Sequence, residues 1–334
     1  MPIRRFKFLA PVVVAAVLSA SISFPQVAFA VEQDLFVDDG PSLTCDNAGT
    51  AVDPFQSVQC AIDAASAGNT IRVAAGDYAG FTVNKALTIL GPKAATSPAT
   101  SDDATSAWGD ASGWAVVKAA SGRVVQVTAA ADGTVIKGFA ITSTNGNVTP
   151  AANGVFGINL LGADNITIQN NYFYDLYNVA ITTSGAPATP RATSYLIDSN
   201  LIANAKGPFD YRGSYYGTEV AAVNPWYIND LTFSNNRISG YGRGVQLEEN
   251  SGAVVRSNYI SDIFYHGIQA ANGQANTLIE GNTVDRAQMA AYYEYFYGGY
   301  CSGAIRLWTV DTSSGFVVRN NLVSNTGATQ RTDI

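Results

Sequence analysis

The chain has 334 residues, of which 13% are charged and 47% hydrophobic, and its formal net charge is −7. This composition excludes a disordered chain, and 31 glycines and 17 tyrosines beside two methionines favour β structure over a helical bundle. The acidic balance disfavours a nucleic-acid-binding surface. The length accommodates either two ordinary domains or one elongated repeat.

The first 30 residues have the pattern of a secretory signal peptide. Three basic residues precede an apolar run over 8–24, and Ala28 and Ala30 form an A-x-A cleavage site. We expect residues 1–30 to be removed and residues 31–334 to form a single domain, secreted or held at the cell surface. Removal leaves 16 basic and 26 acidic residues, a net charge of −10. No later apolar run is long enough to predict a membrane span.

Cysteine usage predicts one disulfide. Export permits disulfides, and Cys45 and Cys60 are close in sequence, so we expect them to pair. Cys301 is then left over, as a buried small side chain or an exposed thiol. With one histidine and no Cys-x-x-Cys pattern, no zinc site is predicted.

The first elements after the leader are a short helix and short strands. Asp53 as N-cap and Pro54 at the first helical position predict a capping helix over 54–67. Strand-like segments punctuated by Gly, Asn and Pro follow, and residues 93–130 have the composition of a loop-rich insertion. Long helices do not alternate with these strands, which disfavours a doubly wound sheet.

One pattern recurs over residues 165–325: an apolar–polar–apolar segment, then Asn, any residue and an apolar residue. Its asparagines are Asn171, Asn200, Asn236, Asn258, Asn282 and Asn321. Their spacings of 29, 36, 22, 24 and 39 residues indicate a unit of 22–24 residues with insertions. This period and the short strands predict a parallel β-helix. Asn tolerates a left-handed backbone at a tight turn, and its amide can bond to the same Asn one coil away, so we expect an asparagine ladder.

The amino-terminal segments 35–40, 54–65 and 68–78 resemble the opening of secreted right-handed parallel β-helix proteins of the pectate-lyase-like superfamily. With the repeats, the resemblance covers nearly all of the mature chain. It implies an all-β fold, a right-handed parallel β-helix with a short amino-terminal capping helix. It does not select an activity, because the superfamily includes lyases, hydrolases, epimerases and non-catalytic surface proteins.

Each unit continues into a further strand, aligned at 179–184, 207–212, 243–248, 266–271 and 303–308. If the apolar positions point inward, alternation puts two columns of side chains on the outer face. The first predicted column is Thr182, Asp210, Gln246, Gln269 and Arg306. The second is Ser184, Arg212, Glu248, Ala271 and Trp308. Coils stack at about 4.8 Å, so these groups form one patch, with Arg243 and His266 at the same edge.

Two tyrosine-rich insertions fall beside this patch. Aromatic rings with polar edges suit sugar faces, although the tyrosines could instead cover an exposed end of the stack. The predicted substrate-binding residues are Arg212, Gln246, Gln269, Trp308, Tyr215, Tyr216, Tyr293 and Tyr295.

Three functions stay open, and the preferred hypothesis is a lyase or epimerase acting on a uronic-acid-containing polysaccharide. The residues assigned to this reaction are Arg243 or Arg306 for the carboxylate, His266 for the base, and Tyr241 or Tyr265 for the proton donor. A histidine with an ordinary pKa of about 6.5 needs little tuning as a base, whereas an arginine would need its pKa lowered by about 4 units.

The second function is an inverting glycoside hydrolase using Asp210 and Glu248, which the predicted register places roughly 8 Å apart. The Gly-His-Gly motif of polygalacturonase-like hydrolases is absent, because Tyr265 precedes His266. The third is a non-catalytic cell-surface or glycan-binding protein. The expected partner is an extracellular polysaccharide, the expected state a monomer. No cofactor is predicted, since Asp210 and Glu248 do not form a carboxylate cluster that would support Ca²⁺.

Overall fold

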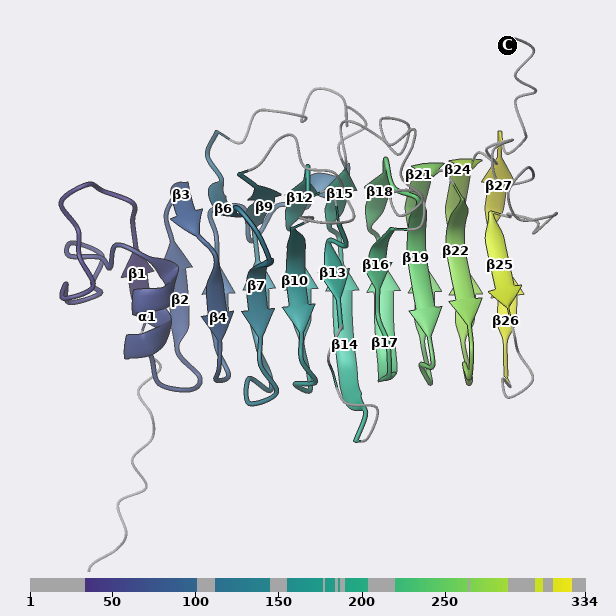
Figure 1. The fold of residues 1–334 in the computed structure, drawn as a ribbon, viewed down its shortest axis with the longest axis horizontal. Coiled ribbons are helices and arrows are strands. Elements are labelled where there is room, and N and C mark those ends of the chain that lie inside the picture. Colours follow the sequence, from purple (N-terminus) through teal and green to yellow (C-terminus); the bar gives the residue numbers. More distant parts are fainter. Residues whose placement is uncertain are drawn as a thin grey trace, which may run out of the picture. The chain divides into compact units, whose positions relative to one another are not determined.

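The computed structural model describes residues 34–100, 112–144, 155–176, 178–183, 186, 190–203, 220–263, 265–287, 304–308 and 315–325. They form three parallel sheets, and the chain visits the ten-stranded, the nine-stranded and the eight-stranded sheet in turn before starting the next coil (Figure 1). The predicted parallel β-helix is confirmed, with three strands in a coil. The predicted signal peptide lies outside the described residues. Within the part of the chain that is described, no helix has the length and apolarity needed to cross a membrane.

From β2 onward each sheet takes every third strand of the chain, and β1 joins the ten-stranded sheet beside β2. The ten-stranded sheet contains, in order, β1 (Asp34–Val37), β2 (Thr70–Val73), β5 (Thr88–Leu90), β8 (Val135–Lys137), β11 (Thr167–Gln169), β14 (Ala192–Asp198), β17 (Ile228–Ser234), β20 (Val254–Arg256), β23 (Leu278–Glu280) and β26 (Val317–Arg319). The nine-stranded sheet contains β3 (Gly76–Ala79), β6 (Ala115–Ala119), β9 (Phe139–Ser143), β12 (Tyr172–Tyr174), β15 (Leu201–Ala203), β18 (Arg237–Ser239), β21 (Tyr259–Ile263), β24 (Thr283–Ala287) and β27 (Leu322–Ser324). The eight-stranded sheet contains β4 (Phe81–Val83), β7 (Arg123–Val127), β10 (Phe156–Leu160), β13 (Ile181–Thr182), β16 (Ala221–Asn224), β19 (Arg243–Glu248), β22 (His266–Ala271) and β25 (Ile305–Trp308). The helices are α1 (Val58–Ala64) and the 3-10 turn η1 (Pro98–Thr100).

The core is a stack of inward-facing apolar side chains, one layer from each coil. In the eight-stranded sheet, the inward column of buried residues consists of Val125, Ile158, Ile181, Val223, Val245 and Ile268, paired in register. Because strand side chains alternate in direction, the residue between two such positions faces outward. Each coil buries its apolar face against its neighbours, which is how a solenoid obtains a continuous core from short strands.

The turn between the ten-stranded and nine-stranded sheets carries the predicted asparagine ladder. The side-chain Nδ2 of Asn200 donates to Oδ1 of Asn236 at 3.0 Å, and Nδ2 of Asn236 donates to Oδ1 of Asn258 at 3.1 Å. The same bond joins Asn171 to Asn200, Asn258 to Asn282, and Asn282 to Asn321. Oδ1 of Asn236 also accepts the backbone N–H of Asn200 at 2.9 Å, so both ends of the amide are bonded.

The left-handed backbone of this turn lies one residue before the ladder asparagine. The residues with positive φ are Asn170 (58°), Ser199 (57°), Asn235 (55°), Ser257 (55°), Gly281 (63°) and Asn320 (56°). The prediction that the ladder asparagine itself takes this conformation was wrong. The corner needs one residue with positive φ, and the next residue then turns its side chain along the stack, where its amide bonds two neighbouring coils.

The capping helix α1 packs on β1, β2 and β4. It begins after Ser57, whose Oγ accepts the backbone N–H of Cys60 at 3.2 Å. The predicted start at Asp53 and Pro54 was wrong. Phe55 instead extends the sheet, since its N–H donates to the carbonyl of Phe36 at 2.8 Å.

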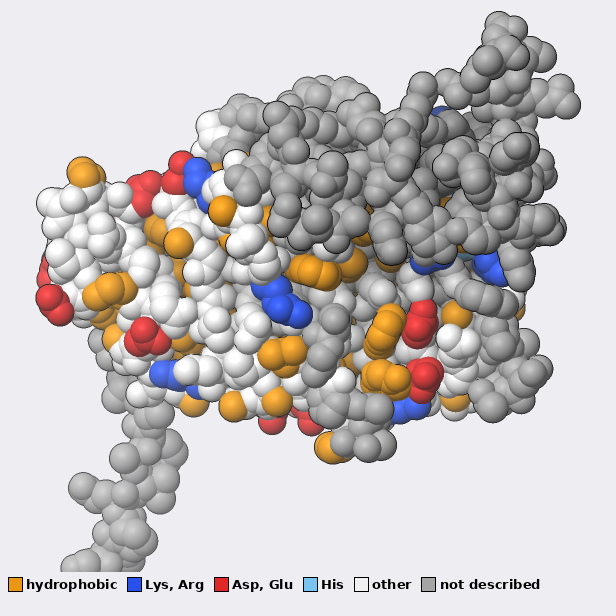
Figure 2. All heavy atoms as spheres, viewed as in Figure 1, with side chains coloured by type: hydrophobic (Ala, Val, Ile, Leu, Met, Phe, Trp, Pro, Cys, Tyr) orange, Lys and Arg blue, Asp and Glu red, His pale blue; other side chains and the backbone are white. Residues whose placement is uncertain are grey.

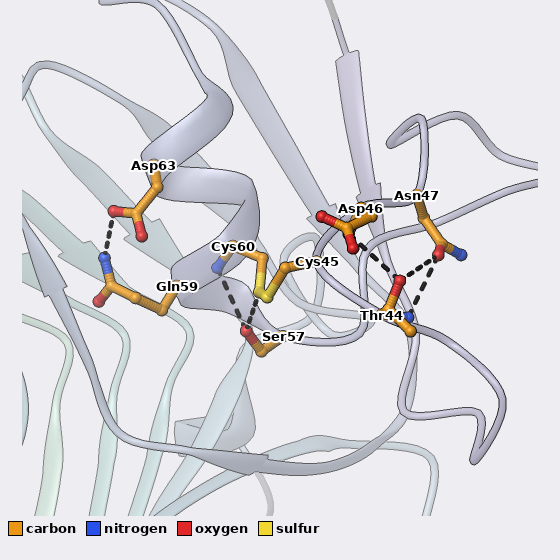
Figure 3. Close-up of a disulfide and its surroundings, with 8 residues drawn as sticks. All are labelled: Thr44, Cys45, Asp46, Asn47, Ser57, Gln59, Cys60 and Asp63. Atoms are coloured by element: carbon orange, nitrogen blue, oxygen red, sulfur yellow. Dashed lines mark hydrogen bonds between the residues drawn. A yellow bond between two sulfur atoms is a disulfide. The ribbon is translucent and has the colours of Figure 1, made fainter.

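The predicted disulfide is confirmed. Cys45, from the loop before the helix, pairs with Cys60 of α1, and their Cα atoms are 5.2 Å apart (Figure 3). The bond ties the loop to the helix at the amino-terminal end of the stack. Cys301 lies outside the described residues.

Residues 93–130 are not one long insertion, because β6 and β7 are regular strands of the stack. The segment before them runs along the ladder turn, where Nδ2 of Asn170 donates to the carbonyl of Ala94 at 2.7 Å and Oγ of Ser97 donates to that of Ser199 at 3.3 Å. Residues 101–111 lie outside the described part. The two strands were missed because their coil lacks the repeated asparagine that marks the later ones.

Candidate active site

The outer face of the eight-stranded sheet carries a column of polar side chains, one from each strand. We call it the polar column: Thr82, Gln126, Asn159, Thr182, Asn224, Gln246, Gln269 and Arg306. Five successive pairs are direct register partners: Thr82–Gln126, Gln126–Asn159, Asn159–Thr182, Thr182–Asn224 and Gln246–Gln269. Gln269 also pairs with Arg306, and Asn224 and Gln246 directly follow the paired Val223 and Val245. The column therefore runs along the whole sheet on the side away from the core.

Several amides of the polar column are buried without hydrogen-bond partners in the protein. Both side-chain polar atoms of Asn159 are unpartnered, and the residue is 0% exposed. Oε1 of Gln269 and Oδ1 of Asn224 are also unpartnered. Buried polar groups in native proteins are nearly always bonded, so these atoms are candidates for bonds to a ligand or ordered water. Buried unpartnered atoms also occur outside the column, in Tyr195, Ser239 and Gln274.

At the carboxy-terminal end of the column lies a group of cationic and aromatic side chains. We call Arg243, Tyr265, His266 and Arg306 the arginine–histidine cluster. Nη1 of Arg306 lies 3.0 Å from Nε2 of His266 and 3.3 Å from the hydroxyl of Tyr265. Arg243 is the register partner of His266, and its guanidinium carbon lies 5.2 Å from the centre of the Tyr265 ring. The predicted juxtaposition of Arg243 and His266 is confirmed.

The contact with Arg306 fixes the tautomer of His266. An arginine stays protonated and can only donate, so Nε2 of His266 accepts and the ring proton sits on Nδ1. His266 is 0% exposed, and its ring centre lies 3.8 Å from that of Tyr265. The imidazole is thus buried, with Nε2 turned toward Arg306.

A second chain of contacts connects Arg243 to a carboxylate along β19. Nη1 of Arg243 donates to Oε1 of Gln246 at 3.0 Å, and Nε2 of Gln246 donates to Oε1 of Glu248. Gln246 therefore holds the cation and the carboxylate apart on the same strand. Arg243 and Glu248 are therefore linked through Gln246 on the outer face of β19.

The predicted alignment of residues 207–212 was wrong. The strand between β13 and β19 is β16, so Asn224 occupies the position predicted for Asp210. Trp226 forms a bridge with Glu248 and thereby takes the place predicted for Arg212 in the second column. The predicted segment 207–212 and the observed segment 221–224 both fit the repeat. The second follows a long insertion, and the sequence pattern does not fix the length of that insertion.

Trp226 is a candidate that sequence reasoning overlooked. Its side chain is 37% exposed beside Glu248, and its ring packs edge-on against Tyr227 with centres 6.5 Å apart. An exposed indole on the outer face offers an apolar surface to a sugar ring. The signal was present in the sequence as an aromatic pair that follows the short, mainly apolar segment 221–224 after one proline.

The other predicted site residues divide into two groups. Tyr241 lies in the hydrophobic core cluster and is 3% exposed, and its role as proton donor stays a prediction. The register of Glu248, Ala271 and Trp308 in the second column is confirmed. Asp210, Arg212, Tyr215, Tyr216, Tyr293 and Tyr295 lie outside the described residues. Over the described ranges, no group of three or more His, Cys, Asp or Glu side chains could hold a metal ion.

The comparisons with known proteins agree with this architecture. The chain matches the family described as the right-handed beta helix region, over residues 119–284 and 156–330. It belongs to this family, and its fold is a parallel β-helix of the pectate-lyase-like type. No curated protein matches the sequence.

Two solved structures illustrate the shared fold. Pectate lyase Pel9A is 13% identical, with a TM-score of 0.52 and coverage of 88% of this chain and 78% of that one. The Streptococcus pneumoniae surface protein and adhesin PfbA is 15% identical, with a TM-score of 0.54 and coverage of 81% and 74% respectively. At this identity the likeness defines the fold, and the side chains of the outer face must carry the functional argument.

Proposed function

We propose that this protein is a carbohydrate-active β-helix that acts as a lyase or epimerase on a uronic-acid-containing polysaccharide. The observation that supports this most directly is the position of Arg306, within hydrogen-bonding distance of both His266 and Tyr265. A cation, a base and a hydroxyl donor thus meet at one end of a polar column that can bind a chain of sugars.

The reaction requires those three groups. One arginine of the cluster binds the uronate carboxylate and stabilises the negative charge that develops when the C5 proton leaves. In elimination, His266 takes the C5 proton, the C4–C5 double bond forms, the C4–O bond breaks, and Tyr265 protonates the leaving oxygen. In epimerisation, the C4–O bond stays intact and a proton returns to C5 from the opposite face.

Arg306 has a further part in this proposal. In the free protein it occupies the lone pair of His266 at Nε2. A substrate carboxylate is a stronger partner for a guanidinium than a neutral imidazole is. Binding would therefore draw Arg306 onto the carboxylate and free Nε2 to act as the base, so that the base becomes available when an acidic sugar is present.

The glycoside-hydrolase alternative loses its proposed carboxylate pair, because Asn224 stands where Asp210 was expected. A non-catalytic glycan-binding protein is the other outcome of the test below. We place the protein outside the cell or at its surface, acting as a monomer on extracellular polysaccharide. Size-exclusion chromatography with light scattering and fractionation of the producing cells test these two points.

The test is a screen of acidic and neutral polysaccharides with product detection. An ultraviolet-absorbing unsaturated product indicates elimination, and exchange of the C5 proton with solvent deuterium indicates epimerisation. Replacing the base or the carboxylate ligand, as in His266→Ala or Arg306→Gln, should lower turnover by about 100-fold or more. Arg256→Gln, an exposed arginine of the ten-stranded sheet, is the matched control. Full activity of His266→Ala, or binding without turnover on every acidic polysaccharide, contradicts the proposal.

A further inference from the structure

A pocket lies at the opposite end of the eight-stranded sheet from the arginine–histidine cluster. Its volume is about 540 Å³, and it is lined by Gln59, Ala79, Gly80, Phe81, Thr82, Lys118, Ala119, Ala120, Arg123 and Gln126. Thr82 and Gln126 are the first two members of the polar column. Gln126 is six strands from Arg306, which is about 29 Å at the usual strand spacing. The pocket and the cluster thus mark the two ends of one column.

The charged residues that line this pocket are cationic, although the chain as a whole is acidic. Among its ten lining residues two are cationic, Lys118 and Arg123, and none is acidic. The whole chain has a net charge of −7. Figure 2 shows basic side chains among mainly uncharged ones on the described part of the molecule. Because Lys118 is paired with Asp77, the positive charge that attracts an anion to this pocket comes mainly from Arg123.

The two cations are held in place at the pocket wall. The guanidinium carbon of Arg123 lies 5.6 Å from the centre of the Phe156 ring, and Nζ of Lys118 pairs with Asp77 at 2.8 Å. Arg123 is exposed, and the side chain of Lys118 is 36% exposed, so both still reach solvent. Pre-positioned cations lose less side-chain entropy when an anion binds.

The remaining lining suits a sugar ring more than a small inorganic anion. Three alanines give the pocket apolar surface, whereas the ring of Phe81 is buried in the core. The amide of Gln126 supplies a polar group beside it. The amide of Gln59 is fixed at both ends, since its Oε1 accepts the backbone N–H of Thr82 at 2.8 Å and its Nε2 donates to Asp63 at 2.8 Å. An apolar patch with a few fixed polar groups and a cation matches a ring that carries hydroxyls and one acidic substituent.

We propose that this pocket is a distal subsite that binds an acidic sugar unit, bearing a carboxylate or a sulfate, and anchors the polysaccharide about 29 Å from the reacting cluster. Its anion binding is independent of the reaction. Its effect on turnover rests on the proposed function, because it requires that the same chain reaches the arginine–histidine cluster.

The binding test uses the full chain and short oligosaccharides that reach one end of the column. Isothermal titration with trigalacturonate, a sulfated disaccharide and neutral maltotriose compares the wild type with two double variants. The pocket variant is Lys118→Gln with Arg123→Gln, and the cluster variant is Arg243→Gln with Arg306→Gln. The wild type should bind about two acidic oligosaccharides per chain and each double variant about one, with affinity at the altered site reduced at least tenfold.

The outcomes separate the two proposals. Binding of trigalacturonate indicates that the pocket takes a uronate, and binding of the sulfated disaccharide indicates that it takes a sulfate. Maltotriose should not bind the pocket. If the pocket variant binds as the wild type does, or maltotriose binds equally well, the distal subsite is wrong while the proposed reaction stands. If the cluster variant keeps full turnover, the proposed function is wrong while the pocket stands. Arg256→Gln again controls for loss of one positive charge.

A kinetic readout tests the anchoring role. With long polymers the pocket variant should show a KM raised by about tenfold and an unchanged kcat, because the lost contact is made equally in the ground and transition states. With oligomers too short to span the column, its kinetics should match those of the wild type. An equal loss on short and long substrates contradicts anchoring.

Discussion

The ladder asparagines and the amides of the polar column are two sets of buried amides that differ in their hydrogen bonding. The ladder asparagines bond to one another and to the backbone on every coil, as Asn236 does with Asn200 and Asn258. The amides of the polar column, such as Asn159 and Gln269, are equally buried but have unpartnered atoms. A bonded amide stabilises the fold, whereas an unpartnered one weakens it until a ligand or water supplies the partner. Amide bonding, rather than burial or residue type, therefore distinguishes the ladder from the polar column.

The largest effect should come from removing one ladder amide. Asn236→Leu removes one hydrogen bond each from the side-chain amide of Asn200 and from the carbonyls of Ile197 and Ser234. We expect the free energy of unfolding to fall by about 3 kcal/mol, measured from denaturant midpoints. A loss below about 1 kcal/mol would show that the ladder is not what holds these coils together.

An intermediate effect should appear as a pH dependence at Asp198, which lies beside the ladder turn. Burial by itself raises the pKa of this carboxyl, but hydrogen bonds from Ser234, Asn235, Ser199 and Gln169 hold it below its ordinary value of 3.8. Because the folded-state pKa is lowered, the stabilisation is present above about pH 4 and is lost as pH falls through the folded-state pKa.

The measurement for Asp198 is the urea midpoint from neutral pH down to about pH 3, compared with Asp198→Asn. The variant should be less stable than the wild type near neutral pH, and the difference should shrink on acidification. A difference that stays constant with pH would show that the charge of Asp198 contributes nothing to its bonds.

The smallest effect on stability, and opposite in sign, should come from the same substitution in the polar column. Asn159→Leu replaces two unpartnered polar atoms by an apolar side chain of similar size. We expect stability to rise by about 1 kcal/mol, because the desolvation penalty of the amide disappears. Binding of a long acidic polysaccharide should weaken in the same variant. If Asn159→Leu destabilises the protein as much as Asn236→Leu, the distinction between the two sets of amides fails.

The ladder and the core could be predicted because they are local and repeated. Six asparagines in one frame mark the same corner of the coil, and the alternation around Val245 and Ile268 fixes which side chains face out. That alternation also places Gln246 above Gln269 and Arg243 beside His266. Cys45 and Cys60 were paired correctly because few residues separate them.

Where an insertion interrupts the repeat, the sequence pattern predicted the wrong strand register. Asn224 rather than Asp210 joins the polar column, because a long insertion can return the chain to the sheet at any short apolar segment. The helix start failed for a related reason. Asp53 and Pro54 satisfy the local rules for a helix, but the backbone of Phe55 donates to Phe36 and accepts from Asp38, which are distant in sequence.

The sequence by itself determined that the chain winds into a β-helix and which residues stack from coil to coil, because both follow from periodic, short-range patterns. Only the tertiary structure decided that Arg306 bonds His266 and Tyr265, and that a cationic pocket faces the other end of the same column. These contacts join residues from different coils, and their geometry depends on side-chain directions that a one-dimensional repeat does not encode.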